Sequence, residues 1–131
     1  MDYFVKHELQ AKYYIRYVDD FALLHESKEQ LEIWKGRINI FLRDKLGLEL
    51  HPDKSKVIPL SRGVDFVGFR NLYHFRLLRK RNIGNMERKV SLFKQEMISK
   101  ETLVESFKGW KAYARWSNSF KLCKRISKEI E

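Results

Sequence analysis

The sequence predicts an α+β fold in which antiparallel hairpins packed on a helix are followed by a three-helix bundle. Two observations lead to this prediction, and a third divides the chain into two parts. Strand-favouring residues flank an Asp19-Asp20 pair near the N-terminus. From residue 79 onward, apolar residues recur every three or four positions, as on one face of a helix. The charge also divides: residues 1–69 hold 11 Lys and Arg against 11 Asp and Glu, whereas residues 70–131 hold 16 against 6.

The first elements are a short helix and a hairpin. Residues 2–10 are expected to end a helix, and residues 12–25 to form two antiparallel strands joined by a tight turn at Asp19-Asp20. The approach, Tyr13–Val18, is rich in aromatic and β-branched residues, and Phe21–Leu24 is a short apolar run. Asp tolerates the positive φ of two-residue turns, which makes the pair compatible with a hairpin tip.

A capped helix is predicted over about residues 28–46. Ser27 is placed as its N-cap, with Gln30 at the capping-box position three residues later. Apolar residues recur at helical spacing between these limits, and Gly47 is placed to end the helix.

Turns and strands are predicted between this helix and residue 79. A Pro52-Asp53 turn is followed by the apolar segment Val57–Leu60, and a second turn at Ser61–Gly63 leads into a strand over residues 64–69. Residues 71–78 are expected to form a further strand, which completes a second hairpin.

Residues 79–131 are expected to form three helices with apolar seams and basic outer faces. The breaks lie near Ser99-Lys100 and Ser117-Asn118. The seams consist of the following residues: Ile83, Met86, Val90, Phe93 and Met97; Leu103, Phe107, Trp110 and Ala114; Phe120, Cys123, Ile126 and Ile130.

Composition excludes several classes of protein. No apolar run approaches the length that spans a bilayer, and the N-terminus has no signal-peptide core. The single cysteine, Cys123, rules out an intramolecular disulfide and offers no zinc spacing, so we expect a reducing, cytoplasmic compartment and a small buried hydrophobe at this position.

Phosphate backbones are the commonest partners of a cationic half such as residues 70–131. An anionic membrane surface is the competing partner, but the bundle already accounts for the apolar seams.

The Asp19-Asp20 pair has two interpretations. Adjacent carboxylates between apolar strands repel each other unless a cation lies nearby, and Mg²⁺ takes carboxylate oxygens together with substrate phosphates. A solvated structural turn is the alternative. Gly68 likewise fits a bulge or a close approach of another backbone. Trp110 and Trp116 fit either base stacking or core packing.

Three motifs follow one another in a recognisable order. These are Tyr17-Val18-Asp19-Asp20, the segment 46–56 with its Lys54-Ser55 pair, and Val64-Asp65-Phe66-Val67-Gly68-Phe69. They resemble, in turn, the Tyr-x-Asp-Asp hairpin, the following Lys-Thr or Lys-Ser block, and the Phe-Leu-Gly-Phe/Tyr strand of prokaryotic reverse transcriptases, of the kind found in group II introns and diversity-generating retroelements. The helical half is similar to the thumb of that family.

The resemblance implies that residues 1–78 are the C-terminal part of a palm and residues 79–131 a thumb. It implies RNA-directed DNA polymerisation, with two metal ions clamping the attacking and leaving oxygens. The implied partners are an RNA template, a DNA primer or an RNA–DNA duplex, and dNTP in the full enzyme. The implied residue roles are Mg²⁺ binding by Asp19 (principal ligand) and Asp20 (weaker), lining of the site by Tyr17 and Val18, triphosphate contact by Lys54, and primer support by Phe66 and Gly68. From the charge pattern, Arg79, Lys80 and Arg81 are expected to contact the nucleic acid.

The sequence also departs from the family. The third metal-binding aspartate and the fingers are expected N-terminal to residue 1, and the only acidic residues before the hairpin are Asp2 and Glu8. We therefore expect the isolated chain to be inactive and to bind Mg²⁺ weakly. A non-catalytic module that binds RNA or an RNA–DNA duplex is the alternative function. In the family this hairpin packs beside the missing palm strand, so the resemblance implies an unpaired strand edge at Tyr13–Val18, from which we expect a homodimer.

Overall fold

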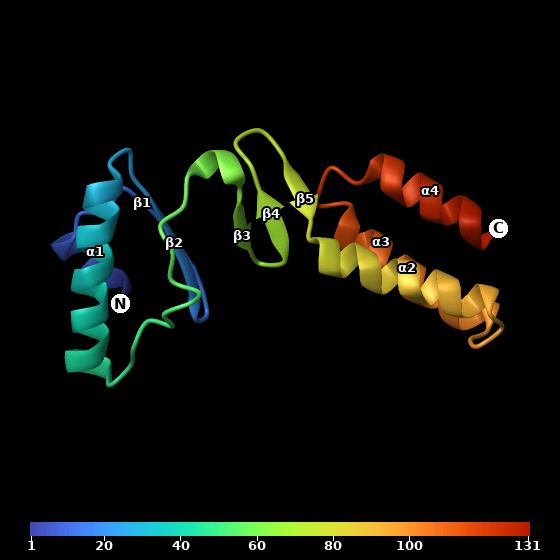
Figure 1. Cartoon of the computed structure of the whole chain (residues 1–131), viewed down its shortest axis with the longest axis horizontal. Coiled ribbons are helices and arrows are strands. Elements are labelled where there is room, and N and C mark those ends of the chain that lie inside the picture. Colours follow the sequence, from blue (N-terminus) through green and yellow to red (C-terminus); the bar gives the residue numbers. More distant parts are fainter. The chain divides into compact units, whose positions relative to one another are not determined.

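The computed structural model describes all 131 residues, and the chain divides into two compact units, Met1–Pro59 and Leu60–Glu131 (Figure 1). Each unit combines helices with a small antiparallel sheet, which confirms the α+β class. No helix has the length and apolar character needed to cross a bilayer.

The first unit packs a two-stranded sheet against helical segments. Its elements are η1 (Phe4–Glu8, π-helical), β1 (Tyr13–Tyr17), β2 (Asp20–Leu24), α1 (Lys28–Phe41) and η2 (Leu42–Leu46, π-helical). The strands pair from Tyr13 with Leu24 to Tyr17 with Asp20. The buried core comprises Phe4, Val5, Leu9, Ala11, Trp34, Ile38 and Leu42.

The helix expected over residues 28–46 is confirmed as α1 and its continuation η2. The hydroxyl of Ser27 accepts a hydrogen bond of 3.1 Å from the N–H of Gln30, as an N-cap should. The reciprocal half of the capping box is absent, because the N–H of Ser27 donates instead to Nδ1 of His25 at 3.0 Å. Gly47 ends the helix with a φ of 63°.

The second unit begins with a short 3₁₀ helix, η3 (Leu60–Arg62). A three-stranded sheet follows in the order β3-β4-β5, with β3 at Val64–Phe66, β4 at Phe69–Asn71 and β5 at Arg76–Leu78. The prediction of two longer strands, over residues 64–69 and 71–78, is therefore wrong. Val67 and Gly68 both have positive φ, 49° and 82°, so the chain reverses at the point where a continuous strand was expected.

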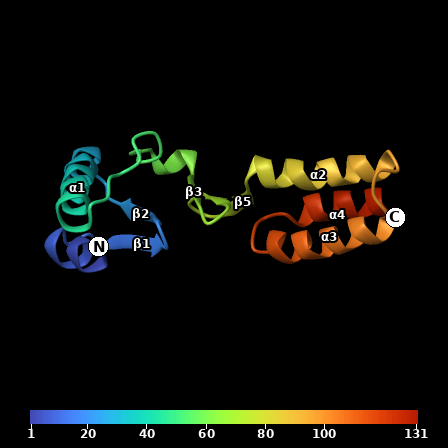
Figure 2. The same ribbon diagram turned by 90° about the horizontal axis from the view of Figure 1, so that it is seen from below.

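Three helices complete this unit: α2 (Lys80–Lys94), α3 (Lys100–Ala114) and α4 (Phe120–Ile130). Figure 2 shows them side by side, which confirms the expected bundle. The hydroxyl of Ser99 caps α3 by accepting a hydrogen bond from the N–H of Thr102 at 3.2 Å. The main core is formed by Met86, Val90, Leu103, Phe107, Ile126 and Ile130.

The division into compact units differs from the expected palm–thumb boundary between residues 78 and 79. The second sheet belongs with the helices, because Phe69 and Leu78 share a buried cluster with Ala114 and Cys123. The burial of Cys123 agrees with its expected role as a small hydrophobe.

Candidate active site and nucleic-acid interface

The tip of the first hairpin carries the carboxylates. Tyr17 pairs with Asp20, so Val18 and Asp19 form the two-residue turn, one residue earlier than the Asp19-Asp20 turn expected from the sequence. Val18 has a φ of 54°, a conformation that is strained for a β-branched residue. Such strain recurs at active sites and persists only where the surrounding strands hold the turn in place.

Both carboxylates at this tip are free to accept a cation. Asp19 and Asp20 are exposed, and neither side chain takes part in an ion pair. No group of three or more His, Cys, Asp or Glu side chains gathers around a common point. Two oxygen-rich side chains suit Mg²⁺, which keeps several waters and binds through one or two carboxylates.

An interaction at the base of the hairpin was missed by sequence reasoning. Arg16 donates from Nε and Nη2 to the two carboxylate oxygens of Asp2, at 2.7 and 2.8 Å, and the hydroxyl of Tyr14 donates to the same carboxylate at 2.7 Å. A third bond, from Nη1 of Arg16 to the carbonyl of Val18, holds the turn. Only the alternation that places Tyr14 and Arg16 on one face of β1 hinted at this cluster.

This cluster fixes the ionisation of its members. The hydrogen bonds from Arg16, and then the one from Tyr14, hold the pKa of Asp2 far below its usual range. Burial, reinforced by the bond to Asp2, raises the pKa of Tyr14 to about 12. Asp2 is one of the two acidic residues that precede the hairpin in the sequence. Its carboxylate is already paired with Arg16.

Lys54, the expected triphosphate contact, lies in the segment that follows η2. Its backbone N–H donates to the carbonyl of His51 at 3.2 Å, in a turn, and its side chain is exposed. No ion pair joins Lys54 to Asp19 or Asp20. The structure therefore does not place the ammonium of Lys54 within ion-pair distance of either carboxylate.

The opposite face of the first hairpin is apolar and uncovered. Tyr13, Ile15 and Tyr17 alternate along β1 and are exposed, while Tyr14 on the other face packs against the core. The sheet has only two strands, so both outer edges are unpaired. An uncovered apolar face with free edges favours association with a second copy.

We expect Ile15→Lys to shift the chain from dimer to monomer, because a charge on this face cannot be buried against a second copy without a large cost. Light scattering coupled to size exclusion measures the mass. Ile33→Lys is the matched control, since Ile15 and Ile33 are each 56% exposed and Ile33 lies on α1. A wild-type chain that stays monomeric at high concentration would contradict this prediction.

Gly68 and Phe66 stand at the turn between β3 and β4. Phe66 pairs with Phe69 across the turn, and a Cβ added at Gly68 would overlap the hydroxyl oxygen of Tyr113. The rings of Tyr113 and Phe69 stack with centroids 4.7 Å apart. Gly68 therefore lies in a turn and not in a bulge. The group that approaches it closely is the side chain of Tyr113 on α3, and not another backbone.

The three cations at the start of α2 that were expected to contact nucleic acid differ in their ionic partners. Nη2 of Arg79 lies 3.5 Å from Asp65, whose carboxylate also accepts two hydrogen bonds from Arg70 at 2.9 and 3.1 Å. These bonds from Arg70 lower the pKa of Asp65. Lys80 and Arg81, in contrast, are exposed and have no ion-pair partner.

The positive charge of the chain belongs to one unit. Residues 1–59 contain 10 Lys and Arg and 10 Asp and Glu, whereas residues 60–131 contain 17 and 7. Only four cations of the second unit lie in ion pairs, namely Arg70, Arg79, Lys94 and Arg125. The remaining cations of this unit form no ion pair with an acidic side chain, and they are the charges expected to contact phosphates.

The two tryptophans of this unit differ in their surroundings. Nε1 of Trp110 donates to the side chain of Asn82 at 2.6 Å, and its ring packs against the helical core. Trp116 is 62% exposed. Core packing therefore accounts for Trp110, while Trp116 keeps a surface on which a base can stack.

Neither a family model nor a curated protein sequence matches this chain. The resemblance to reverse transcriptases is therefore carried by the three sequence motifs and the helical half alone. The structure adds two features: exposed carboxylates at a hairpin tip in one unit and a basic helical bundle in the other.

Proposed function

We propose that this chain is the palm-and-thumb portion of a reverse transcriptase, an RNA-directed DNA polymerase. The observation that supports the proposal most is the tip of the first hairpin, where Asp19 in the turn and Asp20 at the start of β2 are exposed and without ionic partners. A polymerase needs such freely accessible carboxylates, because its metal ions bind carboxylate and phosphate oxygens together.

The proposed reaction joins a primer 3′-hydroxyl to the α-phosphate of a dNTP, with pyrophosphate as the leaving group. Asp19, with Asp20 as the weaker ligand, would hold Mg²⁺, which when bound neutralises the charge that develops on the phosphate oxygens. Tyr17 and Val18 line the surface beside this site. Lys54 is proposed to supply a cation or a proton to the leaving group.

The thumb part of the proposal rests on the charge of the Leu60–Glu131 unit. Lys80 and Arg81 occupy the first turn of α2, where cations oppose the positive end of the helix dipole. A phosphate at this position would interact favourably with both cations and with the free backbone N–H groups. An RNA–DNA duplex held through its backbone is therefore the proposed partner of this unit.

We expect millimolar Mg²⁺ to shift the backbone amide resonances of Val18–Asp20 selectively, and Asp19→Asn to remove most of this shift. The reason is that one ligand of a two-carboxylate site is lost while the other binds only weakly. Two-dimensional NMR of the labelled chain measures the effect. Asp53→Asn, an exposed aspartate in another turn of the same unit, is the matched control and is expected to leave the shift unchanged.

A second candidate function is a non-catalytic module that binds RNA or an RNA–DNA duplex. It is favoured by the confinement of the net charge to Leu60–Glu131, while the unit that carries Asp19 and Asp20 is neutral overall. Duplex binding without any selective Mg²⁺ effect at the hairpin tip would favour this candidate over the polymerase.

A further inference from the structure

The second unit contains an open cavity of about 410 Å³ outside the predicted primer-binding residues. It lies between the loop that joins β4 to β5 and the connection between α3 and α4. The lining residues are Asn71, Leu72, Tyr73, His74, Phe75 and Arg76 on one side and Arg115, Trp116, Ser117 and Asn118 on the other.

Hydrogen bonds fix the two walls of this cavity to each other. The backbone N–H of Asn118 donates to the carbonyl of Arg76 at 2.9 Å, and the backbone N–H of Arg76 donates to the side-chain oxygen of Asn118 at 3.3 Å. Asn71 is also engaged, since its amide group donates to the carbonyls of Val64, Phe66 and Phe69. The cavity is thus built by the fold, and its two amide side chains are already used.

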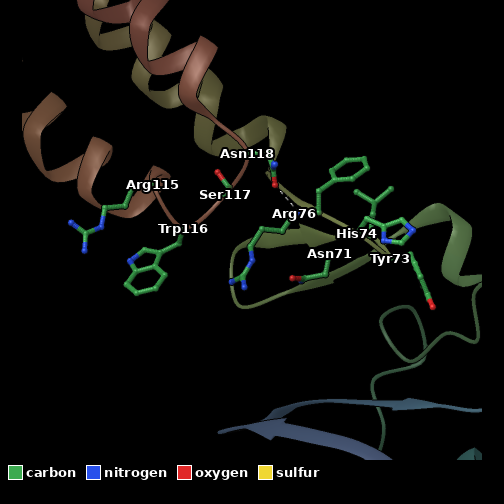
Figure 3. Close-up of a pocket in the computed structure, with 10 residues that line it drawn as sticks. Asn71, Tyr73, His74, Arg76, Arg115, Trp116, Ser117 and Asn118 are labelled. Atoms are coloured by element: carbon green, nitrogen blue, oxygen red, sulfur yellow. Dashed lines mark hydrogen bonds between the residues drawn. The ribbon is translucent and has the colours of Figure 1, made fainter.

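The hydroxyl of Ser117 is used as well, since it donates to the carbonyl of Ala114 at 2.7 Å. Apart from Leu72, the side chains that remain available are aromatic or cationic. Tyr73 is 80% exposed and Trp116 62% exposed. The guanidinium of Arg115 lies 5.5 Å from the centroid of the Trp116 ring. Figure 3 shows Arg76 extending from the sheet toward the side on which Trp116 lies, and Tyr73 at the far end of the hairpin loop. No carboxylate lines the cavity, and neither arginine has an ion-pair partner.

This combination selects a ligand with both flat rings and negative charge. Uncompensated arginines attract phosphates, and exposed aromatic rings stack on bases. The volume of the cavity is within the range of sites that hold small organic groups, so a single nucleotide fits it. Bases are accessible for stacking only where they are not paired, which excludes the interior of a duplex.

We infer that the cavity binds unpaired nucleotides of a strand that extends beyond a duplex held by the same unit. This inference rests on the proposed nucleic-acid binding and adds a second, single-strand site to it. The base stacks on Trp116, and Arg76 and Arg115 contact the phosphates on either side of it.

The test compares three RNA–DNA duplexes that differ only in one end: blunt, with a three-thymidine overhang, or with an overhang of three abasic residues. The two overhangs carry the same charge, so their difference isolates the bases. We expect the thymidine overhang to bind about tenfold more tightly than the abasic one, since stacking of one base is worth about 1.4 kcal/mol or more. Fluorescence anisotropy of labelled duplexes, with the full chain, gives the affinities.

Trp116→Ala is expected to abolish the preference for thymidine while leaving the affinity for the blunt duplex unchanged. Tyr3→Ala is the matched control, because Tyr3 is an aromatic residue of the other unit that is 71% exposed. Equal affinity for the two overhangs, or a preference that persists in Trp116→Ala, would overturn the inference. A cavity made for a phosphorylated peptide would also treat the two overhangs alike.

The outcome distinguishes this inference from the proposed function. Blunt-duplex binding without any thymidine preference would reject the single-strand site and leave the proposed function standing. Absence of binding to all three duplexes would reject both.

Discussion

Gly68→Ala is expected to lower the free energy of unfolding of the Leu60–Glu131 unit by about 2–4 kcal/mol. Two effects add. The φ of 82° at Gly68 is unfavourable for a residue with a Cβ, and that Cβ would overlap the hydroxyl oxygen of Tyr113. The hydroxyl cannot move freely, because the ring of Tyr113 is stacked on Phe69. Amide hydrogen exchange within α3 of the full chain measures the change.

Two further variants separate these effects. Gly84→Ala on α2 is the control, since a Cβ there meets no atom within 4 Å, and it is expected to raise stability by up to about 1 kcal/mol. Adding Tyr113→Phe to Gly68→Ala removes the overlapping hydroxyl and should recover the steric part of the loss. A Gly68→Ala variant as stable as Gly84→Ala would contradict the described turn.

The double variant Lys80→Gln/Arg81→Gln is expected to weaken binding of an RNA–DNA duplex about tenfold or more at moderate salt. It should also reduce the slope of log K against log salt by about two, because each phosphate contact contributes about one. Both side chains are exposed and free of ion pairs, so the fold should not change.

A matched double variant, Lys6→Gln/Lys28→Gln, removes two exposed cations from the neutral unit. Lys28 also opens a helix, so its position parallels that of Lys80. The control should leave both affinity and slope nearly unchanged. An equal loss in both double variants would mean that binding depends on total charge and not on the start of α2.

Local signals in the sequence were sufficient to predict the helices. Ser27 and Ser99 cap α1 and α3 with their hydroxyls, and Gly47 adopts the left-handed conformation that ends η2. These interactions join residues within one turn, so the order of residues alone specifies them. Burial of Cys123 followed from the same helical period.

Turn positions and long-range partners could not be predicted in the same way. Val18 and Val67 are β-branched residues with positive φ, which strand propensity assigns to strands. Their turns are set by the pairing register of the flanking strands, which depends on packing across the whole unit.

The residues around the candidate site were only partly predictable for a related reason. Asp2 and Arg16 are 14 residues apart, and Asn118 contacts Arg76 over 42 residues. No motif or period marks such pairs. Trp116 is the one residue of the cavity for which the sequence raised base stacking, with core packing as the alternative.

The most direct test of the proposed nucleic-acid binding is the affinity of the full chain for a labelled RNA–DNA duplex across a salt series. Binding is expected to be measurable at low salt and to weaken more than about 100-fold between about 50 and 200 mM salt, as it should when at least about four phosphates are neutralised. The cations of Leu60–Glu131 should account for this salt dependence. The slope of log K against log salt should therefore be smaller in Lys80→Gln/Arg81→Gln. Affinity that is independent of salt, or no binding at low salt, would contradict it.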